Sequence, residues 1–269
     1  MKYNLIYFKR TNIHPENLNK LKEKFNLIPI NNFKSIAKIS KNKIRLINAV
    51  YADQNYNFNK NFFQKLKSLK YILSSTTSTS FIDEVYCKKN KIKIFSLEKQ
   101  QKFLKKITPT AEHVFGLIFL ISRNYKQAIE NINLGVFDRK NFVGNKMLSK
   151  SKIGIVGYGR LGKIIKKIAK GFNLKVITYD KAKDKKSKLF QIFNGVDYVS
   201  LNIPLRKNSM FFSRKNFPKN CQNKFYLINT SRGEIIDEKF VIDLLKKKIL
   251  LGYATDVISK EFTNNFNIK

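Results

Sequence analysis

Residues 152–180 read KIGIVGYGRLGKIIKKIAKGFNLKVITYD, and this stretch decides the fold. A short apolar run leads into GYGRLG at 157–162, an amphipathic helical pattern follows, and a second apolar run ends at Asp180. A strand, a glycine turn, a helix and a second strand with a terminal carboxylate are typical, in this order, of a dinucleotide-binding βαβ unit. We therefore predict a parallel α/β sheet that binds a dinucleotide at the glycine turn.

Each residue type in the turn has a physical reason. Gly157 allows the tight turn after the strand, Gly159 lets a pyrophosphate approach the backbone, and Gly162 lets the helix pack closely on the sheet. The carboxylate of Asp180 accepts hydrogen bonds from a ribose and repels a 2′-phosphate, which predicts NAD as the cofactor. The alternative, a glycine-rich turn with no ligand, remains open at this point.

The charge of the chain is its unusual bulk property. The 269 residues carry a formal net charge of +36, from 54 Lys and Arg against 18 Asp and Glu. Lys is spread over every segment together with abundant Asn and Ile, which favours a genome-composition effect over a nucleic-acid-binding surface. We expect no specific nucleic-acid partner, and polyanion binding by a basic protein stays as an alternative.

The cysteine and hydropathy patterns argue against a disulfide-linked protein, a metal-binding protein and a membrane protein. Cys87 and Cys221 lie far apart, and the sequence has no CxxC or HxxxH spacing, so neither a disulfide framework nor a metal site is predicted. This pattern favours a cytoplasmic protein. The N-terminal apolar run is too short for a signal peptide, and the run at 114–121 is far shorter than a membrane span. No membrane association is expected.

The order of elements predicts an α/β protein: a Rossmann-type doubly wound parallel sheet with a second, smaller flavodoxin-like α/β domain. The domains are expected at 1–100 and 101–269, with a connecting helix at 109–123 in the second and Thr108 as its N-cap. Strands are predicted at Asn4–Phe8, Lys43–Val50, Lys70–Ser74, Lys91–Phe95, Asp197–Leu201, Phe225–Asn229 and Leu251–Thr255, and helices at Asn59–Ser68, Ile82–Lys89, Ala111–Arg123 and Glu238–Lys248.

Further segments carry a resemblance to a known family. Residues 229–238, NTSRGEIIDE, resemble the NTxRGxxIDE signature of the D-isomer-specific 2-hydroxyacid dehydrogenases. Residues 252–257, GYATDV, followed by Glu261, resemble that family's GAxxDVFxxEP segment. TAEH at 110–113 and FDR at 137–139 stand in the family's order before the glycine turn. The resemblance runs from about residue 43 to 261 and is more specific in the second half.

The resemblance implies an NAD-dependent oxidoreductase that transfers a hydride between NAD(H) and a 2-hydroxy or 2-keto acid. Domain 1–100 would bind substrate and domain 101–269 would bind NAD, with Arg232 and Glu261 as catalytic residues. The guanidinium of Arg232 suits a substrate carboxylate, and the family uses Glu261 to orient a histidine that donates the proton. Cofactor-binding residues would be Gly157, Gly159, Arg160, Leu161, Gly162, Asp180, Asn202, Pro204, Thr230 and Asp256, and substrate-binding residues Thr76, Thr77, Ser78 and Arg232. Members commonly dimerise through the helix that follows the connecting helix. The resemblance therefore implies a homodimer formed through residues 124–139.

The sequence also departs from the family pattern. The family's histidine belongs to a segment beyond the position of Glu261, and the two histidines present, His14 and His113, are interpreted as structural. Thr76 and Ser78 stand where glycines are common, and Phe262 replaces a proline. These departures predict, as an alternative, a C-terminally truncated relative that binds NAD without turnover. The sequence does not identify the 2-hydroxy acid.

Overall fold

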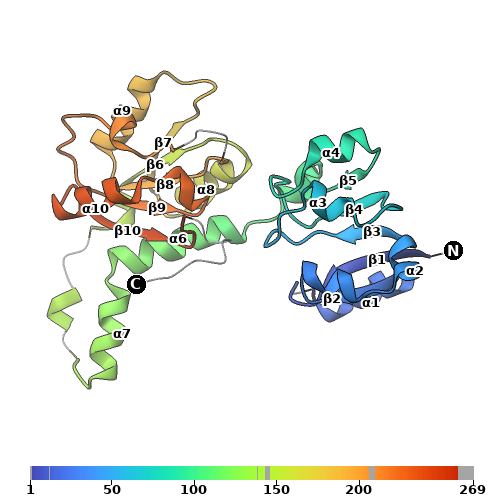
Figure 1. Ribbon diagram of the computed structural model, residues 1–269. Helices are drawn as coiled ribbons and strands as arrows, with labels where there is room; N and C mark the ends of the chain where they lie inside the picture. The colour runs from blue at the N-terminus through green and yellow to red at the C-terminus, as the bar shows by residue number, and fades with distance from the viewer. Residues whose placement is uncertain (1, 12, 138, 143–145, 206–209, 260–269) are drawn as a thin grey trace. The chain divides into compact units, whose positions relative to one another are not determined.

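The computed structural model describes residues 2–11, 13–137, 139–142, 146–205 and 210–259 (Figure 1). The chain divides into two compact units, Met1–Lys106 and Ile107–Lys269. The second unit begins with α6 (Pro109–Ser122), the helix that the sequence places at the domain junction. Thr108 stands at the N-cap position but makes no side-chain capping bond; its hydroxyl bonds to Glu112 instead.

The first unit is built on a parallel five-stranded sheet in the order β2-β1-β3-β4-β5. This order is the flavodoxin-like one expected from the sequence. Its elements are β1 (Tyr3–Phe8), α1 (Pro15–Lys24), β2 (Phe25–Ile30), a 3₁₀ turn (Phe33–Lys38), α2 (Lys41–Arg45), β3 (Ile47–Tyr51), α3 (Lys60–Phe63), β4 (Tyr71–Leu73), α4 (Glu84–Lys89), β5 (Lys93–Phe95), a 3₁₀ turn (Leu97–Lys99) and α5 (Gln101–Leu104).

Three sequence expectations for this unit were wrong. The strand expected at 43–50 is two elements: α2, capped where the Ser40 hydroxyl accepts from the amide of Lys43, and then β3. The helix expected at 59–68 ends at Phe63, because later amides bond to the third preceding carbonyl and tighten the chain into turns. The sequence also missed β2, an edge strand whose pattern is interrupted by Pro29.

Aromatic rings dominate the core of the first unit. Phe8 and Phe58 are fully buried, and the Phe8 ring lies 4.2 Å from the Tyr56 ring in a stacked arrangement. Phe33 and Phe62 extend the cluster, with ring centroids 4.6 Å apart. This cluster packs the segments that follow β2 and β3 onto the end of β1.

The second unit is also built on a parallel five-stranded sheet, in the order β10-β9-β8-β6-β7. When β6 is counted as the first strand of this unit, the strand order is the same as that of the first unit. Its elements are α6, α7 (Tyr125–Asn133), 3₁₀ turns (Arg139–Phe142 and Leu148–Lys150), β6 (Lys152–Val156), α8 (Arg160–Gly171), β7 (Lys175–Tyr179), α9 (Lys186–Gly195), β8 (Tyr198–Leu201), a 3₁₀ turn (Arg214–Asn216), β9 (Phe225–Asn229), a 3₁₀ turn (Gly233–Ile235), α10 (Glu238–Lys246) and β10 (Leu250–Thr255).

Helices cover both faces of this second sheet, which confirms the doubly wound α/β prediction. Helices α6 and α8 pack together on one face, where Ile118 and Ile165 meet Ile153 in one apolar cluster. Helices α9 and α10 pack on the other face, where Phe193 and Phe240 contribute to a second cluster. Alternate residues of β6 point to opposite faces, as a strand with two buried faces requires.

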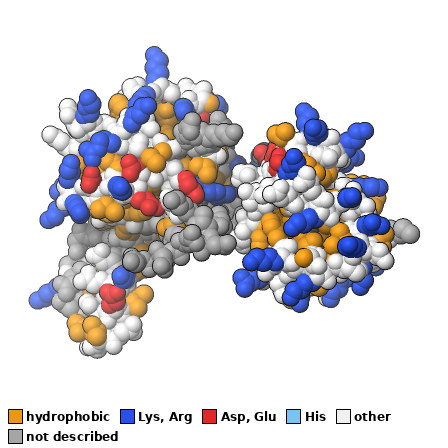
Figure 2. All heavy atoms as spheres, in the orientation of Figure 1, with side chains coloured by type: hydrophobic (Ala, Val, Ile, Leu, Met, Phe, Trp, Pro, Cys, Tyr) orange, Lys and Arg blue, Asp and Glu red, His pale blue; other side chains and the backbone are white. Residues whose placement is uncertain are grey.

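Two surface properties complete the description. Among the described residues, no helix has both the length and the apolar character needed to span a bilayer. On the face visible in Figure 2, Lys and Arg side chains are distributed over both units and do not gather in a single patch.

Candidate functional site

The predicted cofactor residues of the second unit follow the carboxyl ends of its parallel strands. Because all five strands run in the same direction, these ends share one edge of the sheet. Strand β7 lies on one side of β6, and β8, the next strand in the chain, lies on the other side. A crevice between β6 and β8 is therefore expected at this edge. The residues brought to the edge are Gly157, Gly159, Arg160, Leu161 and Gly162 after β6, Asp180 after β7, Asn202 and Pro204 after β8, Thr230 and Arg232 after β9, and Asp256 after β10.

The glycine turn has the geometry that a dinucleotide site needs. Gly157 has a φ of +93°, and a Cβ there would lie 2.3 Å from the backbone oxygen of Asn202. A Cβ on Gly162 would lie 2.3 Å from the oxygen of Gly157, so the start of α8 rests directly on the turn. Gly159 is exposed, and a Cβ there would meet nothing within 4 Å. The turn is therefore closed on the protein side and open beside the first amides of α8.

Two buried polar atoms at this edge lack a hydrogen-bond partner within the described part of the chain. They are Asn202 Oδ1 and Thr230 Oγ1. The Asn202 side chain is held in place because its Nδ2 donates to the carbonyl of Ser200 at 3.1 Å and to the Ser200 hydroxyl at 3.0 Å. Buried polar atoms normally have partners, so unpartnered ones beside a glycine turn are suited to the polar groups of a dinucleotide. The residues present fit such a cofactor.

The loop after β7 holds Asp180 in a defined geometry. Its Oδ1 accepts from the amide of Ala182 at 3.0 Å, and its own amide donates to Asp184 Oδ2 at 2.8 Å. The hydrogen bond from Lys188 is the main cause that lowers the pKa of Asp184. Burial raises the pKa of Tyr179, and the carboxylates of Asp184 and Asp180 add to this effect. The end of β7 is therefore acidic, although the basic segment 181–188 continues into α9.

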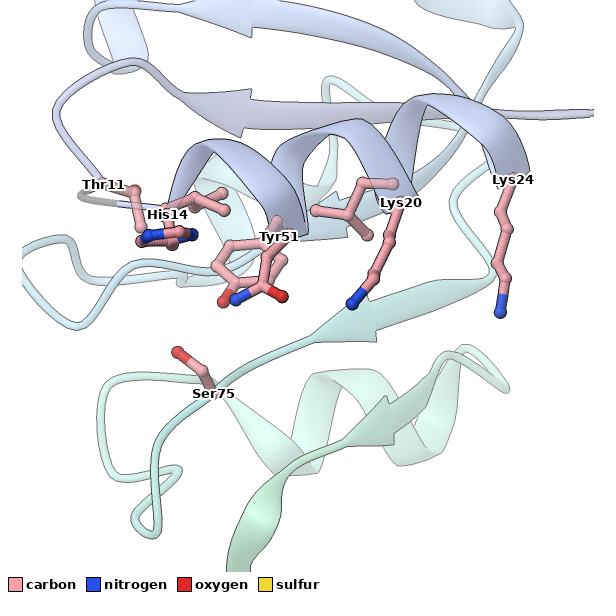
Figure 3. Close-up of a pocket in the computed structure, with 9 residues that line it drawn as sticks. Thr11, His14, Lys20, Lys24, Tyr51 and Ser75 are labelled. Atoms are coloured by element: carbon pink, nitrogen blue, oxygen red, sulfur yellow. The ribbon is translucent and has the colours of Figure 1, made fainter.

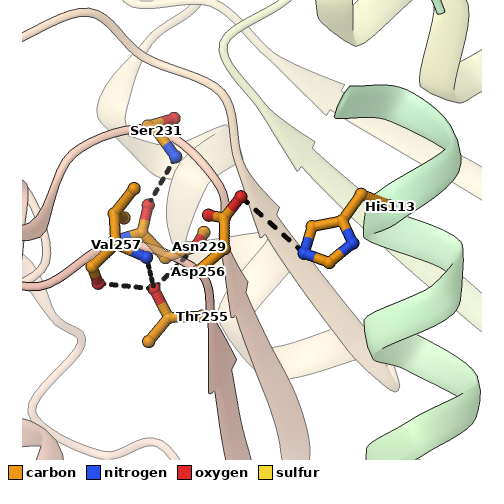
Figure 4. A network of polar contacts seen from close by, with 6 residues as sticks. All are labelled: His113, Asn229, Ser231, Thr255, Asp256 and Val257. Carbon is orange, nitrogen blue, oxygen red and sulfur yellow. Dashed lines mark hydrogen bonds and ion pairs between the residues drawn. The ribbon is translucent and has the colours of Figure 1, made fainter. Parts of the chain in front are cut away.

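A network of hydrogen bonds joins the loops after β9 and β10 (Figure 4). Asn229 Oδ1 accepts from the amide of Ser231 at 3.0 Å, and Asn229 Nδ2 donates to the carbonyl of Arg232 at 3.0 Å. The Thr255 hydroxyl donates to the carbonyl of Asn229, and the Ser231 hydroxyl to that of Leu201, at 2.8 and 2.7 Å. These bonds fix the backbone that carries Arg232, whose half-buried guanidinium donates to the carbonyl of Ser231 at 2.7 Å.

Asp256 lies next to a histidine from a different part of the chain. Its Oδ2 is 3.7 Å from Nε2 of His113, which projects from α6 toward the end of β10 (Figure 4). The sequence interpretation of His113 as structural did not foresee this neighbour, because α6 and β10 lie far apart along the chain.

Three of the four predicted substrate residues, Thr76, Thr77 and Ser78, lie in the first unit, in the loop after β4, whereas Arg232 belongs to the second unit. The hydroxyl of Ser74 lies 2.8 Å from that of Thr76, which donates to the carbonyl of Ser78 at 2.7 Å. The amides of Thr76 and Ser80 bond to the hydroxyls of Ser74 and Ser78, at 3.3 and 3.4 Å. Thr77 is exposed. Neither Thr76 nor Ser78 has a positive φ, so this loop is ordered by its own hydroxyls.

A cleft of about 560 Å³ lies elsewhere in the first unit, between α1 and the ends of β3 and β4 (Figure 3). His14, Lys20, Tyr51 and Ser75 are among its lining residues. It does not include the predicted substrate residues 76–78, so the family resemblance and this cavity do not point to the same place.

Two further points concern the sequence-based assignments. Glu261, the second predicted catalytic residue, lies outside the described residues, as does Asp138 of the FDR segment. Sequence reasoning missed Asn229 and Thr255, although both stand at strand ends. A polar residue that closes an apolar strand, as in the FYLIN run at 225–229, is the signal that points to Asn229.

Comparisons with known proteins agree with this geometry. Residues 115–267 match the family model described as D-isomer specific 2-hydroxyacid dehydrogenase, NAD binding domain. The glyoxylate reductase of Pyrococcus furiosus is 29% identical over 168 residues, which cover 56% of this chain and 50% of that protein. The glycerate dehydrogenase of Methylorubrum extorquens is 28% identical over 211 residues, which cover 76% and 66%. The chain thus spans about half to two thirds of the length of these curated relatives.

Solved structures share the fold over nearly the whole chain. An acyclic imino acid reductase in complex with NADPH and D-Arg is 25% identical, with a TM-score of 0.77 over 97% of this chain and 85% of that one. The D-lactate dehydrogenase of Aquifex aeolicus, complexed with NAD and lactic acid, is 20% identical, with a TM-score of 0.78 over 96% and 78%. The glycine turn, the NTSRG loop and the matched family model converge on one conclusion: the chain belongs to the D-isomer specific 2-hydroxyacid dehydrogenase family.

Proposed function

We propose that this protein is an NAD-dependent oxidoreductase that transfers a hydride between NAD(H) and a small 2-hydroxy or 2-keto acid. The observation that carries the proposal is the meeting, at one sheet edge, of the open glycine turn with two buried polar atoms, Asn202 Oδ1 and Thr230 Oγ1, for which the described residues supply no hydrogen-bond partner. Membership of the family gives this edge its chemistry. The identity of the acid is not part of the proposal.

The proposal assigns each side chain a binding role. The turn at 157–162 and the first amides of α8 would hold the pyrophosphate, since the N-terminus of a helix attracts anions. Asp180 would accept from the adenosine ribose, and Asn202, Pro204 and Thr230 would line the rest of the dinucleotide. Asp256 would contact the nicotinamide carboxamide, and Arg232 would bind the substrate carboxylate through its remaining N–H donors. A bound nicotinamide supplies or accepts the hydride.

The test begins with a fluorescence titration of NADH and continues in the same sample with a panel of 2-keto acids. The chain contains no tryptophan, so the emission of the reduced nicotinamide is read without tryptophan interference. Binding followed by oxidation of NADH supports the proposal. Absence of NADH binding contradicts it, and the assignment of the glycine turn with it.

Asp180→Ala tests the choice of cofactor. Loss of this carboxylate removes a charged acceptor for the ribose and the repulsion of a 2′-phosphate, so the preference for NADH over NADPH should fall at least about tenfold. The matched control is Asp243→Ala, which removes an equally charged but exposed carboxylate on α10 that pairs with Arg214. A preference that is unchanged in Asp180→Ala contradicts the assigned role of this carboxylate.

A second candidate function, NAD binding without turnover, is favoured by one specific observation. The amides of Thr76 and Ser80 already bond to hydroxyls of their own loop, and those amides are the donors that a carboxylate would need. NADH binding without oxidation across the panel would support this candidate over the first. Replacement of Ser74 and Ser78 by Gly would release the amides, and a gain of turnover would locate the defect in this loop.

We further propose that the protein forms a homodimer through α7. No residue of α7 is buried, and the side chains of Ile129 and Ile132 are 59% and 63% exposed. A second copy of the chain would cover this apolar helix, in line with the family pattern. Light scattering after size exclusion should show a dimer that Ile132→Lys converts to a monomer. Val85→Lys, at an exposed position on α4, should leave the dimer intact.

The two thiols support a cytoplasmic location. Cys87 and Cys221 are both buried and unpaired, as expected of a protein that folds in a reducing compartment.

A further inference from the structure

The carboxylate of Asp256 lies beside the imidazole of His113 at the cofactor edge of the second unit (Figure 4). The distance between Nε2 of His113 and Oδ2 of Asp256 is 3.7 Å, and the two side chains are 48% and 41% exposed. Both residues belong to the second unit, so their proximity does not depend on the first. The carboxylate is therefore accessible to a ligand at this edge and is next to an imidazole.

The backbone on both sides of Asp256 is fixed. The hydroxyl of Thr255 donates to the carbonyl of Asn229 and lies 2.8 Å from the carbonyl oxygen of Val257, and the amide of Val257 donates back to this hydroxyl at 3.1 Å. Thr255 is paired in register with Asn229, so Asp256 and Thr230 are the next residues on two adjacent strands. Thr230 carries a buried hydroxyl for which the described residues supply no hydrogen-bond partner.

We propose that His113 and Asp256 together set the preference of this site between oxidised and reduced nicotinamide, with His113 as the proton-dependent component. The inference rests on the proposed function. The oxidised ring carries a positive charge and the reduced ring is neutral. When His113 is neutral, the charge of Asp256 attracts the oxidised ring; when His113 is protonated, the pair is neutral overall and the attraction is lost.

Among the described residues, the elements next to the pair carry further charged and titratable groups. On α6, Glu112 precedes His113 and is bonded by the hydroxyl of Thr108. On α8, which packs on α6, Arg160 donates to the carbonyl of Ile107, just before α6 begins at Pro109. On β10, burial raises the pKa of Tyr253, and the charges of Glu238 and Asp256 contribute to that rise. Carboxylates, guanidinium groups and buried phenols keep their charge state between pH 6 and 8.5, whereas imidazoles change theirs in this range.

The expected size of the effect is that of a charge interaction at a protein surface. A half-exposed carboxylate acts on a neighbouring unit charge through a high effective dielectric, and solvent screening reduces the interaction further. We expect the ratio of the dissociation constants for NAD⁺ and NADH to rise about tenfold as the pH falls from 8.5 to 6. The change should come from weaker NAD⁺ binding, because the reduced ring carries no charge.

The experiment measures both dissociation constants on the full chain, with NADH by fluorescence and NAD⁺ by competition. The variants are His113→Gln and Asp256→Asn, and the matched control is His14→Gln, which replaces the other histidine of the chain. His113→Gln should hold the ratio at its pH 8.5 value throughout, Asp256→Asn should lose the preference for NAD⁺ at pH 8.5, and His14→Gln should behave as the wild type.

A second readout does not depend on affinity. In the His14→Gln protein a single imidazole remains, so its proton resonance is assigned without further work, and addition of NAD⁺ should shift it. The inference is overturned on its own if NADH binds but the ratio does not change with pH, or if His113→Gln retains the wild-type pH dependence. If NADH does not bind at any pH, the result contradicts the proposed function and, with it, this inference.

Discussion

Gly157→Ala should destabilise the second unit more than any other single methyl addition in the glycine turn. The φ of Gly157 is +93°, a region that L-residues avoid. The new Cβ would also lie 2.3 Å from the oxygen and 2.7 Å from the carbonyl carbon of Asn202. Both atoms belong to backbone, so relief of the overlap requires β6 and β8 to move apart where the chain leaves the sheet.

The size of the loss can be worked from these two terms. The positive φ costs about 1–2 kcal/mol for alanine, and an overpacked contact costs about 1–3 kcal/mol. The sum is about 2–5 kcal/mol, which for a unit of this size lowers the melting temperature by roughly 4–20 °C. Scanning calorimetry gives the transition temperatures, and hydrogen exchange of peptides from 152–179 assigns one transition to the second unit.

Gly159→Ala is the matched control within the same turn. Its φ is −79°, and a Cβ there meets nothing within 4 Å, so the melting temperature should change by about 1 °C or less. Its methyl group instead enters the space beside the first amides of α8, so NADH binding should weaken. Equal melting temperatures for Gly157→Ala and the wild type would refute the reasoning about the turn, because neither strain nor overlap would then exist.

Three further outcomes are expected. Thr230→Val replaces a buried, unpartnered hydroxyl by a methyl group; urea unfolding should show a gain of about 1 kcal/mol in the free energy of unfolding, while NADH titration shows weaker binding. Burial raises the pKa of the Cys87 thiol from 9.0 to about 11, so the folded protein holds this proton more tightly than the unfolded chain. The protonated thiol therefore contributes fully to the free energy of unfolding below pH 9, and about 2–3 kcal/mol of it is lost as the pH rises to 11. The difference between wild type and Cys87→Ala in urea unfolding, measured across this pH range, will show the loss. Phe8→Ala removes a ring stacked on Tyr56 and should cost about 3–5 kcal/mol in the calorimetric transition of the first unit, with the second transition unchanged.

Local signals made the second sheet readable from the sequence. The glycines of the turn at 157–162 are explained by local geometry, because a positive φ and two close backbone approaches each require glycine. The strands before Asp180, Asn202 and Thr230 are short apolar runs that end in a polar residue, and parallel pairing brings those ends together. The placement of the predicted cofactor residues at one edge therefore follows from the order of elements alone.

Other features depend on contacts between distant segments. His113 meets Asp256 because α6 packs against β10, and no pattern within either segment predicts this contact. The strand β2 was missed because an edge strand tolerates Pro29, which a local reading takes as a break. The helix α2 was missed because a single hydroxyl, that of Ser40, starts it, and its last residues run directly into the apolar segment that becomes β3.

The unpartnered oxygens of Asn202 and Thr230 have a consequence for the lifetime of the protein in a cell. Within the described residues these two oxygens have no hydrogen-bond partner, which makes the fold less stable than its packing would allow, and a ligand that bonds to them adds its binding free energy to the folded state. A bound dinucleotide would then raise the free energy of unfolding in addition to its role in the reaction. The abundance of the protein would follow the size of the dinucleotide pool, because molecules that fail to bind one unfold and are degraded sooner.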